Sequence, residues 1–265
     1  MINSHLVKRA LIVFVYVILF ALVGFLIYFI KTPGSTCSDG KKNQGEKNVD
    51  CGGPCNPCKA NDAAENLSIV EKKFVSGGSN NFDVLIKISN PNELVGASSF
   101  HYSISLKDES GSILAAKEGY NYILPADSKY IAELGLSVSG GAVPVTVDFS
   151  IDGVVWSQLG KIEKPQLSVY NKKFQPDSGG IGSKAEGLVR NESPNDFKKI
   201  DIIVILSDEQ GNLLAINTTQ KENIRAQKEG SFVLTWPYGF SNIVRNMEVD
   251  VQTNVFDSEN FSAGI

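Results

Sequence analysis

The feature that most constrains this chain is an internal duplication. The segment LSIVEKKF at 67–74 returns as LSVYNKKF at 167–174, and DESGSILA at 108–115 returns as DEQGNLLA at 208–215, both 100 positions later. Two further matched segments are offset by 101 and 102 positions, so the copies differ only by small loop changes. The sequence therefore predicts two tandem domains, each long enough to bury its own core.

Each copy has the residue pattern of a β domain. In FDVLIKIS at 82–89, large apolar residues occupy every second position, which is typical of a strand with one buried face. In KIDIIVILSD at 199–208 both faces are apolar, which predicts a central strand. About seven strands in each copy, separated by turn residues, predict an all-β fold of two tandem immunoglobulin-like β-sandwiches. The short joint at 160–165 is expected to limit their relative motion.

The matched hairpins also carry a family resemblance. DESG and DEQG place Gly111 and Gly211 where a tight turn needs positive φ, and their paired carboxylates are expected to serve the turn. Together with ISLKD at 104–108, VILSD at 204–208 and the upstream asparagine turns NPN and RNES, they resemble the FxLYD family. The resemblance implies small extracytoplasmic β-sandwiches, often membrane-anchored, without an agreed catalytic activity or ligand residues. Only the Leu and the Asp of the motif are present in both copies.

A second constraint is an apolar run near the amino terminus. Residues 11–30 contain no charge, and as a helix they extend about 30 Å, one hydrocarbon core. A signal peptide has a shorter core of about 7–15 residues and a small-residue cleavage site, and a lipoprotein would need an aliphatic residue three positions before Cys37. The sequence predicts an uncleaved transmembrane helix at 10–31. Because Lys8 and Arg9 precede it, the N-terminus is predicted to be cytoplasmic and the downstream domains extracytoplasmic.

The charge of the chain excludes one class of partner. Its net charge is −4, and the first 31 residues are net basic, so the remainder is acidic. No basic patch interleaved with aromatic residues offsets this acidity. Binding to DNA or RNA through the phosphates is therefore excluded.

All four cysteines follow the apolar run closely, with the spacing C-x13-C-x3-C-x2-C. Outside the cell such thiols tend to pair, whereas a four-cysteine zinc site usually has two C-x2-C arms, and only the last two cysteines form one. A catalytic dithiol would need a helix start, and the glycines and prolines here break helices. The sequence favours a disulfide-bonded knot over a zinc or redox site. All three pairings stay open among Cys37, Cys51, Cys55 and Cys58.

Oxygen-bearing side chains recur between the first two cysteines at intervals of three or four residues. Hard cations are bound by such groups, and calcium is the only cofactor that the sequence suggests. The alternative is a solvated loop held by Asx-type turns. The pattern CxDGxxNxGExxVDCGGxCxxC at 37–58 also resembles a short cysteine module of archaeal and bacterial surface proteins, which implies an extracytoplasmic spacer. The candidate calcium ligands are Asp39, Asn43, Glu46 and Asp50.

The sequence offers no catalytic constellation. Histidine is the commonest general base, and the chain has only His5, before the apolar run, and His101, on a predicted strand. No Ser-His-Asp, Cys-His or two-histidine arrangement can be assembled from them. Trp156 and Trp236, one in each copy, are expected to be core anchors rather than sugar platforms. We therefore expect that the chain is not an enzyme.

Four N-x-S/T sequons mark candidate glycosylation sites in a chain exposed outside the cell. Asn217 is expected to be the most exposed of the four acceptors. The candidate acceptors are Asn66, Asn191, Asn217 and Asn260.

The sequence thus predicts a single-pass, membrane-anchored extracytoplasmic protein that displays two β-sandwiches for binding or scaffolding at the cell surface. Its partners would be the membrane and a protein or surface polymer. The alternative is an accessory subunit of an envelope secretion, pilus or cell-wall assembly complex. The predicted order is a cytoplasmic N-terminus at 1–9, a transmembrane helix at 10–31, a cysteine-rich module at 36–58, β-sandwiches at 66–160 and 166–257, and a flexible tail at 258–265.

Overall fold

The computed structural model divides the chain into two compact units. They comprise residues 1–63 and residues 64–265. The structure describes residues 4–31, 37–39, 41, 43, 45–46, 50–56, 64–159, 164–176 and 182–262.

The first unit begins with one long helix. This helix, α1 (Ser4–Lys31), has 28 residues. Its side chains are described at Arg9 and at 12–25, and the large apolar ones among them are exposed. Within this described part of the chain, no helix combines the length and the hydropathy needed to span a membrane. The transmembrane helix expected at 10–31 stays a prediction.

The second unit is all-β, and its first copy is a sandwich of two antiparallel sheets. One sheet has the strand order β1-β2-β5 and the other β4-β3-β6. The described part of this copy contains six strands rather than about seven, because β6 is followed directly by the joint to the second copy. The strands are β1 (Ser68–Gly78), β2 (Asn81–Asn90), β3 (Gly96–Lys107), β4 (Ile113–Ile123), β5 (Asp127–Ser137) and β6 (Thr146–Ser157).

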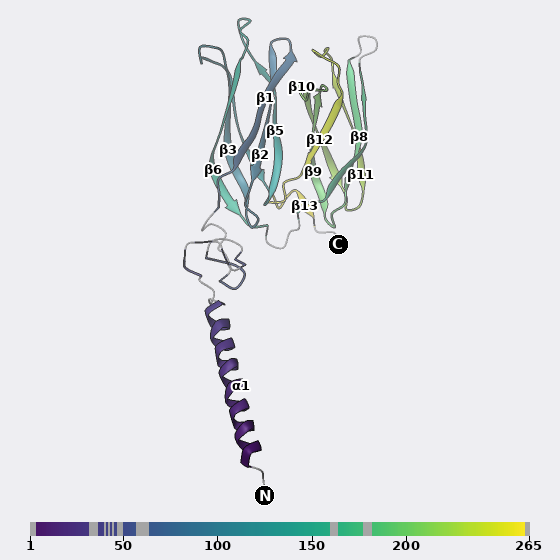
Figure 1. Cartoon of the computed structure of the whole chain (residues 1–265). Coiled ribbons are helices and arrows are strands. Elements are labelled where there is room, and N and C mark those ends of the chain that lie inside the picture. The colour runs from purple at the N-terminus through teal and green to yellow at the C-terminus, as the bar shows by residue number, and fades with distance from the viewer. Residues whose placement is uncertain are drawn as a thin grey trace. The chain divides into compact units, whose positions relative to one another are not determined.

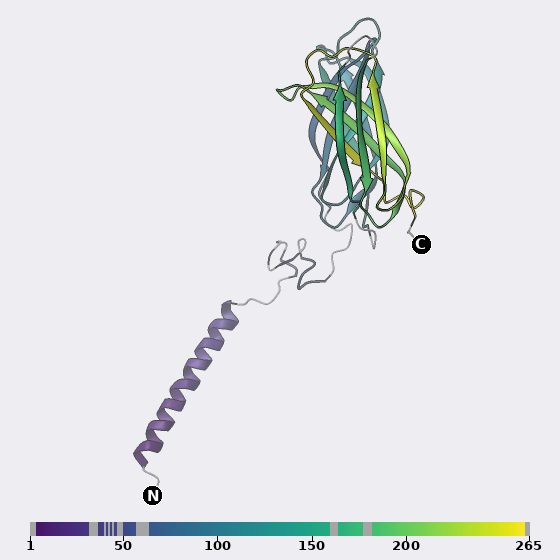
Figure 2. The ribbon, with the colours of Figure 1, turned by 90° about the vertical axis from the view of Figure 1, so that its right-hand side faces the viewer.

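The second copy repeats this topology strand for strand. Its sheets have the orders β11-β8-β7 and β10-β9-β12, and a short strand, β13, also pairs with β9. Figure 2 looks onto the β11-β8-β7 sheet, with the first copy behind it. The expected β-sandwiches are thus confirmed. The strands are β7 (Leu167–Gln175), β8 (Ser183–Asn191), β9 (Asp196–Ser207), β10 (Leu213–Ile224), β11 (Glu229–Trp236), β12 (Asn246–Gln252) and β13 (Phe261–Ser262).

Each sandwich has its own apolar core. In the first copy, the alternating side chains of β2 and β3 point inward, so that Ile86, Ile88 and Phe100 are fully buried. In the second, Trp236 is 1% exposed, and its Nε1 donates to the carbonyl of Ile216 at 3.0 Å. Trp236 is therefore a core residue, as predicted. Trp156, which lies on β6 and so at a different position of the fold, is partly buried against the core of the first copy.

A buried asparagine closes the same turn in both copies. Asn90 donates from Nδ2 to the carbonyls of Val95 (2.8 Å) and Leu124 (2.9 Å). Its Oδ1 accepts from the backbone N–H of Asn92 at 3.0 Å. Asn191 makes the three equivalent hydrogen bonds in the second copy. Because buried carbonyls without a partner are costly, these two side chains are part of the fold itself.

The two sandwiches stack face to face, and four sheets follow one another across the unit (Figure 1). The sheet β1-β2-β5 of the first copy packs on β10-β9-β12 of the second. The doubly apolar segment at 199–208 is therefore a central strand, as predicted, with one face in its own core and the other in the stack. We call this contact the seam; its buried residues are Leu85, Tyr130, Ile203, Ile205 and Ile216.

The stack joins sheets that are not equivalent. On β3, which corresponds to β9, Ser103 and Ser105 stand where β9 has its two seam isoleucines. On β8, Glu186 stands where β2 has its seam leucine. Because the two outermost faces carry these polar groups, a third copy could not bury apolar surface on them in the same way.

The sequence predicts a flexible tail at 258–265, whereas its described part, residues 258–262, is ordered; residues 263–265 lie outside the described residues. Residues 258–260 form a turn, and β13 pairs with the start of β9. Asn260 is 7% exposed and donates from Nδ2 to Thr253 Oγ1 (2.9 Å) and the carbonyl of Asn254 (2.8 Å). The backbone of Lys198 donates to the carbonyl of Asn260 at 2.7 Å. These hydrogen bonds explain the order, which a polar, serine-rich sequence does not predict.

Candidate functional site

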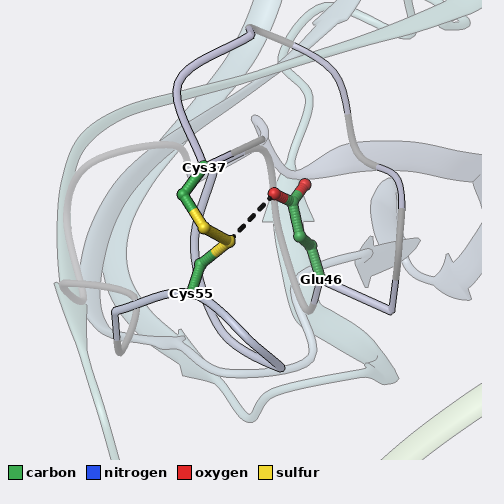
Figure 3. A group of neighbouring side chains, drawn as sticks. All are labelled: Cys37, Glu46 and Cys55. Atoms are coloured by element: carbon green, nitrogen blue, oxygen red, sulfur yellow. Dashed lines mark hydrogen bonds between the residues drawn. A yellow bond between two sulfur atoms is a disulfide. The ribbon is translucent and has the colours of Figure 1, made fainter. Parts of the chain in front are cut away.

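The cysteine module contains a disulfide between Cys37 and Cys55 (Figure 3). Cys51 is disulfide-bonded as well, and no cysteine among the described residues is free. Cys58 lies outside the described residues. The predicted disulfide knot is thus confirmed for the described cysteines. Because their sulfurs are already bonded to sulfur, this oxidised form has no thiolates to offer a zinc ion.

The four candidate calcium ligands lie in one hydrogen-bonded loop. The buried carboxylate of Glu46 accepts from the backbone N–H of Asn43 (3.1 Å) and of Asp50 (3.3 Å). Its Oε1 lies 3.2 Å from Cys55 Sγ (Figure 3). Asp39 and Asp50 also accept from neighbours within the loop. Among the described residues, the buried Oδ1 of Asn43 has no hydrogen-bond partner and is left over as an acceptor.

This loop supports both of the interpretations that the sequence leaves open. Its carboxylates hold backbone amides, as the Asx-type interpretation expects. The leftover amide oxygen of Asn43 is a group that calcium binds. Calcium binding stays a prediction.

The four glycosylation candidates differ in burial. Asn66 is exposed. Asn217 is only half-buried, but its Nδ2 donates to the carbonyl of Thr235 at 2.9 Å, so it is not the most exposed acceptor. Asn191 and Asn260 are buried and use their amides to hold the fold. Glycosylation stays a prediction, for which the folded chain presents Asn66 best.

Polar side chains of the second copy form hydrogen bonds with Tyr130 of the first copy. Tyr130 lies on β5, at the edge of its sheet, where no further strand of that sheet pairs with its backbone N–H and carbonyl. Its N–H donates to Asp250 Oδ2 (3.2 Å), and its carbonyl accepts from Gln252 Nε2 (2.9 Å). Its hydroxyl donates to Glu248 Oε2 at 3.4 Å. These three residues alternate along β12 and share one face, which fixes the sandwiches relative to each other.

A buried lysine lies next to this contact. Lys129 is 3% exposed, and its Nζ donates to Asn121 Oδ1 at 2.8 Å. The ammonium group is 3.6 Å from the centre of the Tyr122 ring. Burial lowers the pKa of Lys129 to about 7, against the opposing effect of Asp250, Asp201 and Asp127. The hydroxyl of Tyr122 is buried and has no hydrogen-bond partner in the described part of the chain.

Lys129 and Tyr122 line two cavities at the seam. The smaller one, of about 200 Å³, is also lined by Asp250 and Thr253. The larger one, of about 460 Å³, is also lined by Asn121. Burial raises the pKa of Asp250, so its proton is held more strongly than that of an exposed aspartate. A lysine and a carboxyl group with opposite pKa shifts at one cavity form a candidate reactive site.

A second buried carboxylate stands elsewhere on the seam. Asp83 on β2 is 5% exposed and accepts from the backbone N–H of Gly135 at 2.8 Å. It also accepts a hydrogen bond from Tyr238 of the second copy. Burial raises the pKa of Asp83 and raises the pKa of Tyr238 to about 12.

His101 lies on the outer face of the β4-β3-β6 sheet. Its Nδ1 is 3.2 Å from both carboxylate oxygens of Asp152, and its Nε2 is 3.7 Å from Glu118. Its ring packs on that of Tyr120, which is 76% exposed. Charged side chains thus surround this exposed aromatic pair.

Comparisons with known proteins do not assign the chain to a family. No family model matches it, and no curated protein matches it. A solved structure that is similar is the calcium binding domain CBD12 of CALX1.1, with 9% identity and a TM-score of 0.21. The alignment covers 63% of this chain and 75% of that one. So low a TM-score carries no argument about fold or ligand, and the FxLYD resemblance stays a prediction.

The lysine site was not expected from the sequence, although one signal was present. Lys129 stands two residues before Ile131, so on an alternating strand it points toward the core. A charge at an inward position is rare unless it is paired. The corresponding residue in the second copy is Gly230, which marks Lys129 as a difference between the copies.

Proposed function

We propose that this chain is a single-pass, membrane-anchored extracytoplasmic protein. In this proposal it presents two fused sandwiches as one rigid unit that binds or scaffolds a protein or a polymer at the cell surface. The observation that carries it is the seam, which makes residues 64–265 one compact unit rather than two independently moving domains. A rigid spacing between two outer faces is what a scaffold requires.

Two features support the position in the cell. The uncharged run at 11–30 lies within a single helix whose described apolar side chains are exposed, as a lipid-facing helix needs. The disulfide between Cys37 and Cys55 follows that helix, and disulfides persist in oxidising compartments. Both features support a position of the sandwiches outside the cell.

The strand pairing supports an immunoglobulin-like class for the sandwiches. In each copy the second strand pairs with the fifth and the third with the sixth, as the B–E and C–F pairs of that class do. The surface best suited to a partner is the outer face that carries Tyr120, because exposed aromatic residues are enriched at binding sites.

Labelling of intact cells tests the position. A single cysteine placed on the outer face, as Ser103→Cys, should react with a thiol reagent that cannot cross the membrane. Ser4→Cys, at the start of α1, is the matched control and should react only after the cells are lysed. If Ser103→Cys is protected in intact cells and Ser4→Cys is labelled, the proposed topology is inverted and the display function fails.

A further inference from the structure

A buried amine and a half-buried carboxamide meet beside the seam. Lys129 Nζ lies 2.8 Å from Asn121 Oδ1, and the Tyr122 ring covers the amine at 3.6 Å. Lys129 is on β5 and Asn121 on β4, in opposite sheets of the first sandwich. The amine is thus held within hydrogen-bond distance of the carboxamide by strands that do not pair with each other.

The amine is in a state that can react. A lysine attacks only as the neutral amine, and most lysines are protonated at neutral pH. Burial shifts the balance for Lys129 toward the neutral form, while three carboxyl groups around it favour the charged form. These are Asp127 on its own strand, Asp201 on β9 and Asp250 on β12, and the aromatic face is that of Tyr122 on β4. The neutral form dominates once the pH rises above about 7.

The carboxamide is also polarised. Asn121 Oδ1 accepts a second hydrogen bond, from the backbone N–H of Tyr122 at 2.9 Å. This donor stays in place when negative charge develops on the oxygen, as the donors of an oxyanion hole do. Asp250 lines the same cavity as Lys129, which brings one carboxyl group to the neighbourhood of the amine.

From this geometry we propose that Lys129 and Asn121 join in an intramolecular isopeptide bond. The Nζ–Cγ bond forms, the Cγ–Nδ2 bond breaks, and the leaving nitrogen departs as ammonia. The proton lost by Nζ passes to Nδ2 through the carboxyl group of Asp250, which is unchanged at the end. No oxidant, reductant or cofactor takes part. The product links β4 covalently to β5, next to Tyr130, which is hydrogen-bonded to the second sandwich.

The second copy serves as an internal comparison. Asn121 pairs with Phe100 on β3, and the residue that pairs with the corresponding Ile200 on β9 is Lys221. The position of Lys129 is taken by Gly230. The second copy therefore has no such pair, and the chain as a whole is expected to lose a single ammonia.

Intact mass spectrometry of the reduced, full-length chain in detergent tests the proposal. The wild-type mass should lie below the sequence mass by one ammonia. Trypsin should not cut after Lys129, and cleavage before Asp127 should not separate the two halves of the linked peptide. Lys129→Arg should show the full sequence mass, whereas Lys87→Arg, a matched change at a lysine that also lies over a tyrosine ring, that of Tyr130, should keep the deficit. Asp250→Asn should lower the cross-linked fraction and slow the loss of ammonia.

Two results would overturn the proposal, and neither depends on a variant that folds. One is a wild-type chain that keeps its full sequence mass after prolonged incubation at alkaline pH. The other is a deficit of one ammonia in a chain that trypsin still cuts after Lys129, because a succinimide at an asparagine loses the same mass without joining the two side chains.

Discussion

The seam can be tested by replacing its residues on β9 with the residues that the corresponding strand β3 carries on its outer face. Ile203→Ser with Ile205→Ser replaces the two seam isoleucines by the residues that β3 carries at the same register, so the backbone is already known to accept them. Ser103→Ala with Ser105→Ala on the free outer face is the matched control. The double serine variant should weaken the contact between the sandwiches while leaving the inward-facing residues of both cores intact.

The size of the effect follows from burial. Both isoleucines are 6% exposed, and burying an isoleucine side chain contributes about 1.5–3 kcal/mol. The pair therefore contributes about 3–6 kcal/mol to the free energy of unfolding. The double serine variant should not lose more unfolding free energy than this, because the sandwiches can separate and let water hydrate the serines. The alanine control should change the free energy of unfolding by less than about 0.5 kcal/mol.

Urea unfolding, followed by far-UV circular dichroism, reports the result. The wild-type chain should unfold in one cooperative transition, since the seam couples the two cores. The double serine variant should unfold in two, each with about half of the wild-type dependence on denaturant. A variant that unfolds in a single transition with unchanged midpoint would refute the view that the seam holds the sandwiches together.

Three further predictions concern single residues. Asn90→Ala leaves two buried carbonyls without a donor and should cost about 3 kcal/mol of unfolding free energy in a urea titration; a loss similar to that of an exposed residue would contradict the role of this turn. Burial raises the pKa of Asp83 in the folded protein. The free energy of unfolding of the wild-type protein should therefore fall as the pH rises from 3.8 through the folded-state pKa, because ionising the buried carboxyl group is costly. Asp83→Asn should therefore be the more stable form in thermal unfolding at neutral pH, and this advantage should vanish below pH 3.8. Titration calorimetry of the full chain with calcium should give heat that Asn43→Ala abolishes, and the absence of heat in the wild type would remove the calcium prediction.

The sequence by itself determined the features that depend on local pattern. Alternating apolar residues report which face of a strand is buried, so the duplication, the sandwiches and the central position of 199–208 could be read without coordinates. The cysteines indicated a disulfide knot from their spacing and their place after the apolar run, and Cys37 confirms it. The spacing could not choose the partner of Cys37, since all three pairings fit the same composition.

Only the tertiary structure decided which surfaces meet. A strand pattern says that a face is covered but not by what, so the packing of Leu85 against Ile203, more than 100 positions away, could not be foreseen. Asn191 likewise matches a glycosylation sequon, but in the folded chain its amide is buried and hydrogen-bonded to backbone carbonyls of two turns. Lys129 and Asn121 lie on strands of opposite sheets, and their contact depends on how the sandwich closes. Local sequence fixes the period of burial, whereas contacts between sheets depend on the packing of segments far apart in the chain.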